Sequence, residues 1–285
     1  MDLVTLIPLA VKVSVCLTVF ALGLGASHQD LWYLFRRPAQ LAKSLLAMNV
    51  VMPILAAALA AAFGLRPAVK IALVALAVSP VPPALPGKQL KAGGRVSYAI
   101  GLLTAAALLA IVFVPASVEL LGRAFAKDVH VRPAAVARLV LISVLIPLAA
   151  GVALRAVAPA LAGRIARPIS LVSTSLLVVA ALAVLAGSWR AELALVGHGT
   201  LAALAVFILV GLAVGHLLGG PDPDDRTVLA LSTASRHPGI ALAIAGAAFP
   251  GEKLALPAVL VYLIVGAIVS IPYVMWRRRH QRTPR

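Results

Sequence analysis

The chain carries little charge for its length. Only 12% of its 285 residues are Asp, Glu, Lys or Arg, and 62% are hydrophobic. Soluble domains carry about 25% charged residues, so this composition excludes a soluble enzyme or binding module. The mean hydropathy is +1.05, and apolar runs follow one another along the full length. We therefore predict an all-α polytopic membrane protein that forms a single unit over residues 1–285.

Cysteine and acidic residues are also scarce. The one cysteine, Cys16, lies in an apolar run, which excludes a disulfide bond and a cysteine metal site. Nine acidic residues stand against 25 basic ones. The basic residues lie mostly in short loops between apolar runs, where they set membrane topology, so we expect no nucleic-acid partner. We expect no cleavable signal peptide, because the first apolar run leads into an aromatic and basic loop.

Nine apolar runs are long enough to cross a bilayer as helices. They cover residues 3–25, 39–63, 67–90, 95–122, 134–156, 168–188, 193–219, 226–249 and 254–276. An odd number of crossings places the two termini on opposite sides of the membrane.

The basic residues divide unequally between alternate loops. One set of loops, with the C-terminal tail, holds Arg36, Arg37, Lys43, Lys88, Lys91, Arg95, Arg155, Arg164, Arg167, Arg226, Arg277, Arg278, Arg279, Arg282 and Arg285. The other set holds Arg66, Lys70, Arg123, Lys127, Arg132, Arg138, Arg190 and Lys253. Because positive residues are enriched in cytoplasmic loops, we predict an outside N-terminus and a basic cytoplasmic tail over residues 277–285. We expect a bacterial inner (plasma) membrane protein.

The run over residues 226–249 contains a polar segment at its middle, residues 232–239. A charged side chain at the centre of a transmembrane helix costs several kcal/mol, roughly 3 or more, and Arg236 stands there without an acidic neighbour in sequence. Pro238 lacks an amide hydrogen, and Gly239 tolerates unusual dihedral angles. We predict a broken helix, whose free backbone groups are tolerated only around a cavity. That pattern is typical of a binding site.

The run over residues 67–90 is interrupted in the same way. The expected helix breaks are Pro82, Pro83, Pro86 and Gly87, with Pro238 in the second segment. Leu85-Pro86-Gly87 repeats the pattern of His237-Pro238-Gly239, and the two segments, five crossings apart, run in opposite directions. Interrupted spans at matching places in two halves predict a secondary transporter with an inverted repeat and a binding site at the membrane midplane.

Other polar and small residues have several interpretations. Asn49 either lines a cavity or is a buried amide satisfied by a neighbouring helix. The acidic loop 221–225 lacks the ligand spacing of a calcium site, and Asp224 or Asp225 is expected to cap the eighth span.

Glycines within the spans are expected to allow close helix contacts. The four are Gly23, Gly25, Gly211 and Gly215.

Several ordered motifs resemble the bile acid:sodium symporter family. They are Phe20-Ala21-Leu22-Gly23-Leu24, Asp30, Arg37-Pro38, Val51-Met52-Pro53, the proline-interrupted third span that ends near Gly94, and the polar segment before Pro238-Gly239. The resemblance implies the nine-helix form of the family and transport by symport. It also implies a panel domain and a core domain, in which the two interrupted helices cross near a cavity for organic anions.

The chain departs from the family at the sodium sites. Sodium-coupled members carry E-x-G-x-Q-N in the eighth span, where this chain has Ser232, Ala234, Arg236 and His237. The family's Gly-Gly-Thr-Ala-Ser-Asn stretch is replaced by residues 81–86, and Thr104 is followed by three alanines. We find no acidic residue deep inside any span. Arg236 would repel a cation 4 Å away by about 4 kcal/mol, so we expect no cofactor and no sodium coupling.

We therefore expect Arg236 to take the electrostatic role of sodium and to bind an anion with its forked donors. The start of the second half-helix at Gly239 would add its positive end. His237 is the candidate for proton coupling, and Lys88 either assists or lies at the cytoplasmic mouth. Neutral hydrogen bonds are expected from Ser79, Ser232, Thr233 and Ser235. Aromatic residues are only 5% of the chain, which favours a small organic anion over a steroid.

Other interpretations stay open at this point. Arg236 is alternatively a structural arginine that binds carbonyls freed by the breaks, and His237 is alternatively bonded to a carbonyl. The chain is alternatively a sodium-coupled symporter with a rearranged ion site, or a channel or sensor on the same fold. An enzyme is not expected, because the spans contain no acid/base pair, activated nucleophile or metal cluster.

Overall fold

A computed structural model describes residues 3–124 and 132–282, and every regular element among them is a helix. The first half contains α1 (Leu3–Gly25), α2 (His28–Leu31), α3 (Pro38–Leu45), the π-helix η1 (Leu46–Val51), α4 (Met52–Ala62), α5 (Pro67–Val78), α6 (Leu85–Lys91) and α7 (Val96–Ala124). The second half contains α8 (Pro133–Val140), the π-helix η2 (Leu141–Leu145), α9 (Ile146–Val157), α10 (Pro159–Leu195), α11 (Thr200–Leu218), α12 (Pro223–Ala234), α13 (Pro238–Ala248), α14 (Ala255–Val269) and α15 (Ile271–Arg282).

Eight segments of the described residues are long and apolar enough to cross a membrane. They correspond to eight of the nine expected spans. The third expected span instead contains the shorter apolar helix α5, with 12 residues. The sixth expected span is longer than predicted, because the helix of α10 runs on through Arg164 and Arg167 and has 37 residues, or about 55 Å at 1.5 Å per residue.

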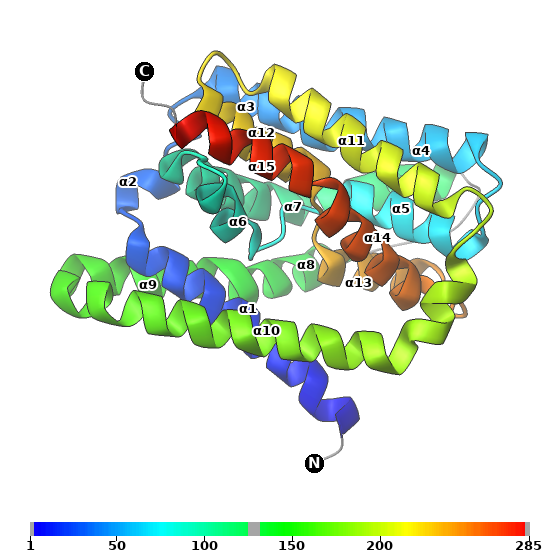
Figure 1. Ribbon diagram of the computed structural model, residues 1–285, viewed down its shortest axis with the longest axis horizontal. Coiled ribbons are helices and arrows are strands. Elements are labelled where there is room, and N and C mark those ends of the chain that lie inside the picture. Colours follow the sequence, from blue (N-terminus) through cyan, green and yellow to red (C-terminus); the bar gives the residue numbers. More distant parts are fainter. Residues whose placement is uncertain (1–2, 125–131, 283–285) are drawn as a thin grey trace.

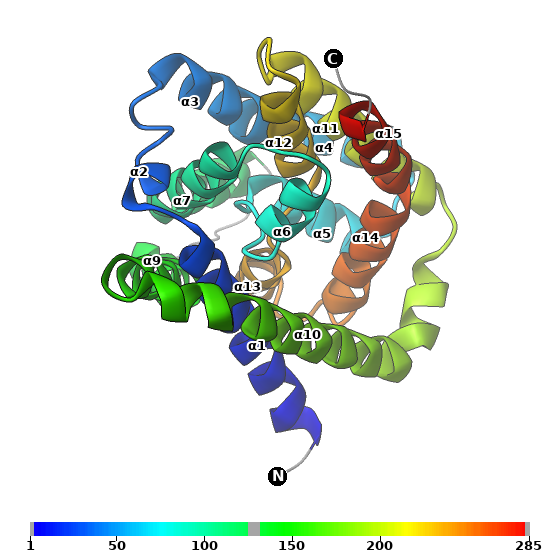
Figure 2. The same ribbon diagram turned by 60° about the vertical axis from the view of Figure 1, so that its left-hand side comes forward.

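The helices form two groups (Figures 1 and 2). Helices α1, α9 and α10 pack against one another and form the lower layer in both views. The other group contains α4, α5, α11, α12, α13 and α14, and α10 also packs against α14. The two interrupted segments, α5–α6 and α12–α13, therefore lie within the larger group.

The two interrupted segments cross at their breaks. Helix α5 packs against α13, and α6 packs against α12. The break of the first segment covers residues 79–84, and the break of the second covers residues 235–237. The amide of His237 donates a hydrogen bond to the carbonyl of Pro80 over 2.9 Å, so the two breaks are bonded to each other directly.

The prolines place these breaks. Pro82 and Pro83 lie in the first break, where neither can donate a backbone hydrogen bond. Pro86 and Gly87 lie in the first turn of α6 instead of in the break, because proline is tolerated where an amide has no partner inside the helix. Pro238 is likewise the first residue of α13, so the second break precedes it.

Three of the four expected glycine contacts are present. A Cβ atom on Gly215 would lie 2.5 Å from the Cα of Ala230, and one on Gly211 would lie 2.9 Å from the Cα of Ala234, so α11 and α12 touch through their backbones. Gly23 meets Gly151 of α9 in the same way. The expectation for Gly25 was wrong: no atom lies within 4 Å of its Cβ position.

The helix cap at the start of α12 also differs from the expectation. The side chain of Asp222 accepts a hydrogen bond from the amide of Asp224 over 2.9 Å. Asp222 is the cap, rather than Asp224 or Asp225, because the helix begins at Pro223, three residues before the expected span boundary at residue 226. Asp225 instead accepts hydrogen bonds from Arg95 at 2.6 Å and from Gln40 at 3.0 Å.

Candidate functional site

Arg236 lies at the crossing of the two breaks, with 1% of its surface exposed. Its Nη2 atom donates to the carbonyl of Met48 in η1 over 2.9 Å, and Nη1 donates to the carbonyl of Ser79 over 3.3 Å. The third nitrogen, Nε, is buried and its N–H has no partner. Arg236 thus connects three elements that are far apart in the sequence.

Arg236 has no ion-pair partner among the described residues. Carbonyl oxygens stabilise the guanidinium only by their partial charges. The crossing of the two breaks therefore keeps a net positive charge. The carbonyl of Ser79 is free to bind it because the helix of α5 ends at Val78.

His237 is 9% exposed and precedes the first residue of α13. Its Nδ1 atom accepts a hydrogen bond from the amide of Ile240 over 3.4 Å. In the neutral tautomer that accepts at Nδ1, the hydrogen lies on Nε2, and Nε2 is buried without a partner. The imidazole therefore caps α13 and offers one unused donor.

The hydroxyl residues of the two segments have different environments. The hydroxyls of Ser79 and Thr233 donate to carbonyls of their own helices, those of Leu76 and Leu229, both over 2.8 Å. Ser235 in the second break is half-buried and forms no hydrogen bond with the rest of the described chain. Gly239 is exposed at the start of α13, so the accessible surface of the second break consists of Ser235, Pro238 and Gly239.

Lys88 lies apart from Arg236, toward the end of the first segment. Its half-buried Nζ atom donates to the hydroxyl of Ser270, at the junction of α14 and α15. Lys88 therefore connects α6 to the last helix of the chain.

Gln89 was missed by sequence reasoning. It is 1% exposed, and its Nε2 atom donates to the hydroxyl of Ser232 over 2.6 Å and to the carbonyl of Val228 over 3.0 Å. Its Oε1 atom is buried without a partner. Ser232 thus meets Gln89 rather than Arg236. The signal available in the sequence was a glutamine four residues before the Gly93-Gly94 turn. This signal is weak, because the glutamine stands between two lysines, as in an exposed loop.

Glu192 is a buried carboxylate that the expected span boundaries left in a loop. It lies near the end of α10, is 6% exposed, and accepts a hydrogen bond from the hydroxyl of Ser188 over 2.7 Å. Glu192 became part of a helix because α10 continues beyond the predicted boundary at residue 188, and it lies in the last turn of that helix rather than deep inside a span.

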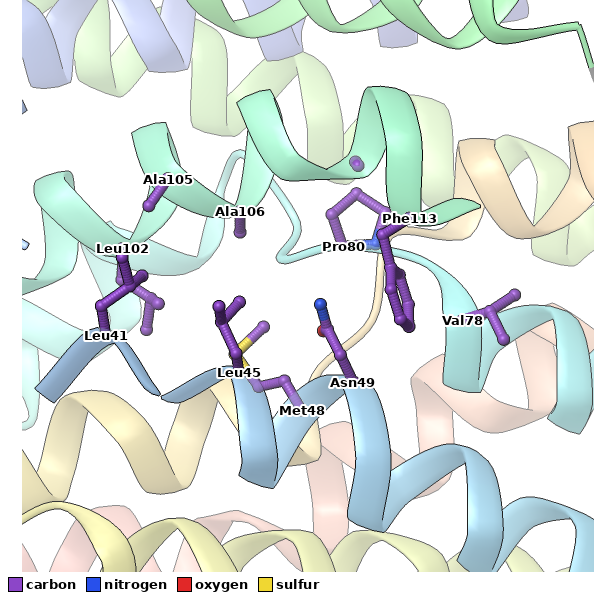
Figure 3. A pocket seen from close by; sticks show the side chains of 11 residues that line it. Leu41, Leu45, Met48, Asn49, Val78, Pro80, Leu102, Ala105, Ala106 and Phe113 are labelled. Atoms are coloured by element: carbon purple, nitrogen blue, oxygen red, sulfur yellow. The ribbon is translucent and has the colours of Figure 1, made fainter. Parts of the chain in front are cut away.

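A small pocket lies beside the first break (Figure 3). Side chains of η1 and the end of α3 form one wall, α7 forms the other, and Pro80 closes the side toward the break. The cavity has a volume of about 10 Å³, which is room for about one water molecule. Asn49 is the polar residue among its lining side chains, so one of the two interpretations of this amide, that it lines a cavity, is confirmed.

Comparison with known proteins identifies the family. Residues 13–192 match the model of the Sodium Bile acid symporter family. The "Sodium-dependent organic anion transporter" of Mus musculus is 26% identical over 282 residues, which cover 94% of this chain and 74% of the mouse protein. The protein of the same name from Rattus norvegicus is also 26% identical and is covered over 75% of its length.

The match to the family model includes the first break and ends before the second. Its limit at residue 192 lies in α10, so the segment with Arg236 and His237 is outside the matched part. The matched part is still well over half of the chain. The chain therefore belongs to the sodium bile acid symporter family, a family of membrane transporters and not of enzymes.

Proposed function

We propose that this chain is a secondary transporter of a small organic anion and that Arg236 acts as a resident cation in place of bound sodium. The observation that carries the proposal is the unpaired guanidinium of Arg236, which is buried at the crossing of two broken helices and bonded to two backbone carbonyls. Carbonyl oxygens are also the groups that bind hard metal ions in proteins. The guanidinium thus occupies the kind of oxygen site that a cation would fill.

A second cation at this site is electrostatically unfavourable. Two unit charges 4 Å apart repel by about 4 kcal/mol at an effective dielectric constant of 20, which is roughly a thousandfold loss of affinity. The same field attracts an anion. Transport of an anion without sodium follows from a positive charge that is permanently in place.

The surface of the second break suits an anionic group. Gly239 is exposed at the start of α13, a helix of 11 residues whose positive end lies there. Ser235 offers a hydroxyl without a partner in the described structure. In this conformation each Nη atom of Arg236 donates one of its two hydrogens to a carbonyl. Arg236 attracts the anion through its charge, and Nε–H and the second hydrogen of each Nη remain for direct contact.

The fold is suited to alternating access. We assign the panel to α1, α9 and α10 and the core to the group that contains the crossing, and we infer an inverted repeat with nine crossings in which α5–α6 counts as one. Substrate then crosses as the core moves against the panel. His237, with its unused Nε2 donor, is the residue we assign to proton coupling.

Sodium-coupled transport is the second candidate, because the mouse and rat relatives are named sodium-dependent organic anion transporters. Their name is also the reason for an organic anion as substrate. The substrate, the coupling ion and the bacterial plasma membrane as location all belong to this proposal.

A thermal-shift screen separates the two candidates. Detergent-purified protein is heated with each of a set of small carboxylates and sulfonates, once in sodium chloride and once in potassium chloride at equal ionic strength. We expect at least one anion to raise the unfolding midpoint equally in both salts. An anion effect that needs sodium contradicts the proposal and supports the second candidate.

The charge of Arg236 is tested by substitution. We expect Arg236→Gln to weaken anion binding at least tenfold, which corresponds to about 1.4 kcal/mol, and Arg236→Lys to keep most of it, because lysine preserves the charge. Arg190→Gln removes the same charge from an exposed position and should leave binding unchanged. A folded Arg236→Gln protein with normal anion binding contradicts the proposal. Failure of both Arg236 variants to fold, with no anion effect in the parent protein, supports a purely structural arginine.

A further inference from the structure

The pocket between η1 and α7 has a cause in the sequence. Ala105, Ala106 and Ala110 of α7 line it, and their short side chains leave space opposite the side chains of η1 (Figure 3). Phe113 lies at the end nearest Pro80 and Asn49. The space is too small for a ring system and large enough for a group the size of a methyl.

The contact between α11 and α14 is filled by aromatic rings. There the rings of Phe207 in α11 and Tyr262 in α14 meet edge to face with centroids 6.2 Å apart, and the hydroxyl of Tyr262 donates to the carbonyl of Ala234 over 2.8 Å. The pocket between η1 and α7 is lined by three alanines and one aromatic ring, Phe113. The space is therefore found where α7 carries its alanines.

Asn49 needs a polar partner that the described chain does not supply. Its side chain is half-buried, lines the pocket, and makes no hydrogen bond to any described residue. Its amide atoms are not among the fully enclosed polar atoms without a partner, so they are open to a polar group that enters the pocket, whereas lipid tails offer no hydrogen bond. The π-helix η1 turns this part of the chain so that Asn49 points toward Pro80 and Phe113. π-turns inside α-helices occur frequently at functional sites.

The pocket wall is bonded to Arg236. Met48, next to Asn49, accepts a hydrogen bond from the guanidinium over 2.9 Å, and Ser79, next to Pro80, accepts another. Both Met48 and Pro80 line the pocket. A ligand in the pocket is thus separated from the buried positive charge by one layer of backbone, which favours a ligand with negative charge.

We propose that this pocket is a specificity subsite for the transported anion: it takes an apolar substituent the size of a methyl group, while the Asn49 amide donates a hydrogen bond to a neighbouring oxygen of the substrate. The inference rests on the proposed function, because it assumes that the chain binds an organic anion. It adds to the proposed function the size of the substituent and the residue, Asn49, that forms a hydrogen bond with the adjoining polar group of the substrate.

The probes are two short series of acids. The straight-chain carboxylates acetate, propionate, butyrate and hexanoate report the size limit, and the corresponding 2-oxo acids pyruvate and 2-oxobutyrate report the hydrogen bond of Asn49. Dissociation constants come from thermal shifts or calorimetry on the full chain in detergent. We expect tightest binding for acetate and pyruvate, which have a single methyl group beyond the polar group, and weaker binding as the chain lengthens to hexanoate.

Two variants and a matched control test the subsite. Ala106→Val fills the pocket and should weaken acetate and pyruvate at least fivefold while changing hexanoate, whose chain is too long for the pocket, less than twofold. Ala116→Val makes the same change on an exposed part of α7 and should have no effect. Asn49→Leu should remove the preference for the 2-oxo acids over the plain carboxylates.

The outcomes separate this inference from the proposed function. If no anion stabilises the parent protein, the proposed function fails and the subsite fails with it. If anions bind the parent protein but Ala106→Val and Asn49→Leu change neither the size preference nor the 2-oxo preference, the subsite is wrong and the proposed function stands. Stabilisation by a phospholipid acyl chain, lost in Ala106→Val without any effect on anions, also overturns the subsite.

Discussion

The hydrogen bond between Gln89 and Ser232 connects the two broken helices through a pair of buried side chains. The Nε2 atom of Gln89 uses one hydrogen for Ser232 and one for the carbonyl of Val228. Removing one partner of a buried pair leaves the other unsatisfied, whereas replacing both by apolar groups is nearly neutral. Ser232 therefore matters because it satisfies Gln89.

We predict that Ser232→Ala destabilises the protein by about 1 to 3 kcal/mol and that the double variant Gln89→Leu/Ser232→Ala regains more than half of this loss. The measurement is the thermal unfolding midpoint of the purified variants. Ser175→Ala removes an exposed hydroxyl of α10 and serves as the control. A double variant less stable than Ser232→Ala would show that Gln89 holds the helices together by more than this pair.

At the scale of single residues, the sequence shows that Arg236 is unusual but does not show which atoms it contacts. Arg236 stands out in the sequence because an isolated charge in an apolar run is rare. Its partners do not stand out, since they are backbone carbonyls of Met48 and Ser79, and every residue has a carbonyl. The burial of Gln89 is not visible in the sequence for another reason. Gln89 stands between Lys88 and Lys91, which is the sequence context of a loop, and it is buried because α6 packs against α12.

The contact between α11 and α12 limits how early the second break can begin. Three glycines at four-residue spacing, Gly211, Gly215 and Gly219, face α12 so closely that an added Cβ would lie 2.9, 2.5 and 2.5 Å from its backbone. Backbone atoms cannot move aside as a flexible side chain can. Helix α12 is therefore in close backbone contact with α11 from Arg226 to Ala234, and the chain can change direction only after Ala234.

We predict that Gly215→Ala destabilises the protein by about 1 to 3 kcal/mol, as overpacking does, and weakens anion binding by displacing the second break. Gly246→Ala is the matched control, because Gly246 is inside α13 with no atom within 4 Å of its Cβ position. There the better helix propensity of alanine should stabilise by up to about 1 kcal/mol. Equal thermal midpoints for the two variants would contradict the close contact seen between α11 and α12.

At the scale of elements, proline predicts that a segment is interrupted but not where the next helix begins. Both interrupted segments are visible in the sequence because proline cannot continue a helix from its interior. The start of α6 at Leu85 is less visible, since Pro86 is compatible with a first turn as well as with a break. The extent of α10 was underestimated for a different reason: Arg164 and Arg167 suggested a loop, although arginine is a good helix former and the helix continues through both.

At one end of the molecule, several connecting segments are joined by hydrogen bonds. Arg95, before α7, is bonded to Asp225 of α12, and Gln40 of α3 is bonded to the same carboxylate. Arg278 of α15 donates to the carbonyl of Lys91 over 2.8 Å. In Figure 1 this end, with α2, the turn between α11 and α12 and the C-terminus, lies on the left, and the α4–α5 and α10–α11 connections lie on the right. The loops at the end with the C-terminus are those predicted to be cytoplasmic.

The orientation of these two ends can be measured by labelling. In a Cys16→Ser background, which removes the one native cysteine, Lys253→Cys and Arg279→Cys place single thiols at exposed positions of the opposite ends. Because the basic end faces the cytoplasm under the positive-inside rule, we predict that a membrane-impermeant maleimide labels Lys253→Cys on intact cells and labels Arg279→Cys only after the membrane is opened. Labelling of Arg279→Cys alone on intact cells would invert the predicted topology. Labelling of both from one side would mean that the chain crosses the bilayer between the two positions an even number of times, which α14–α15, with 26 residues from Ala255 to His280, makes sterically difficult because about 20 residues span the bilayer once.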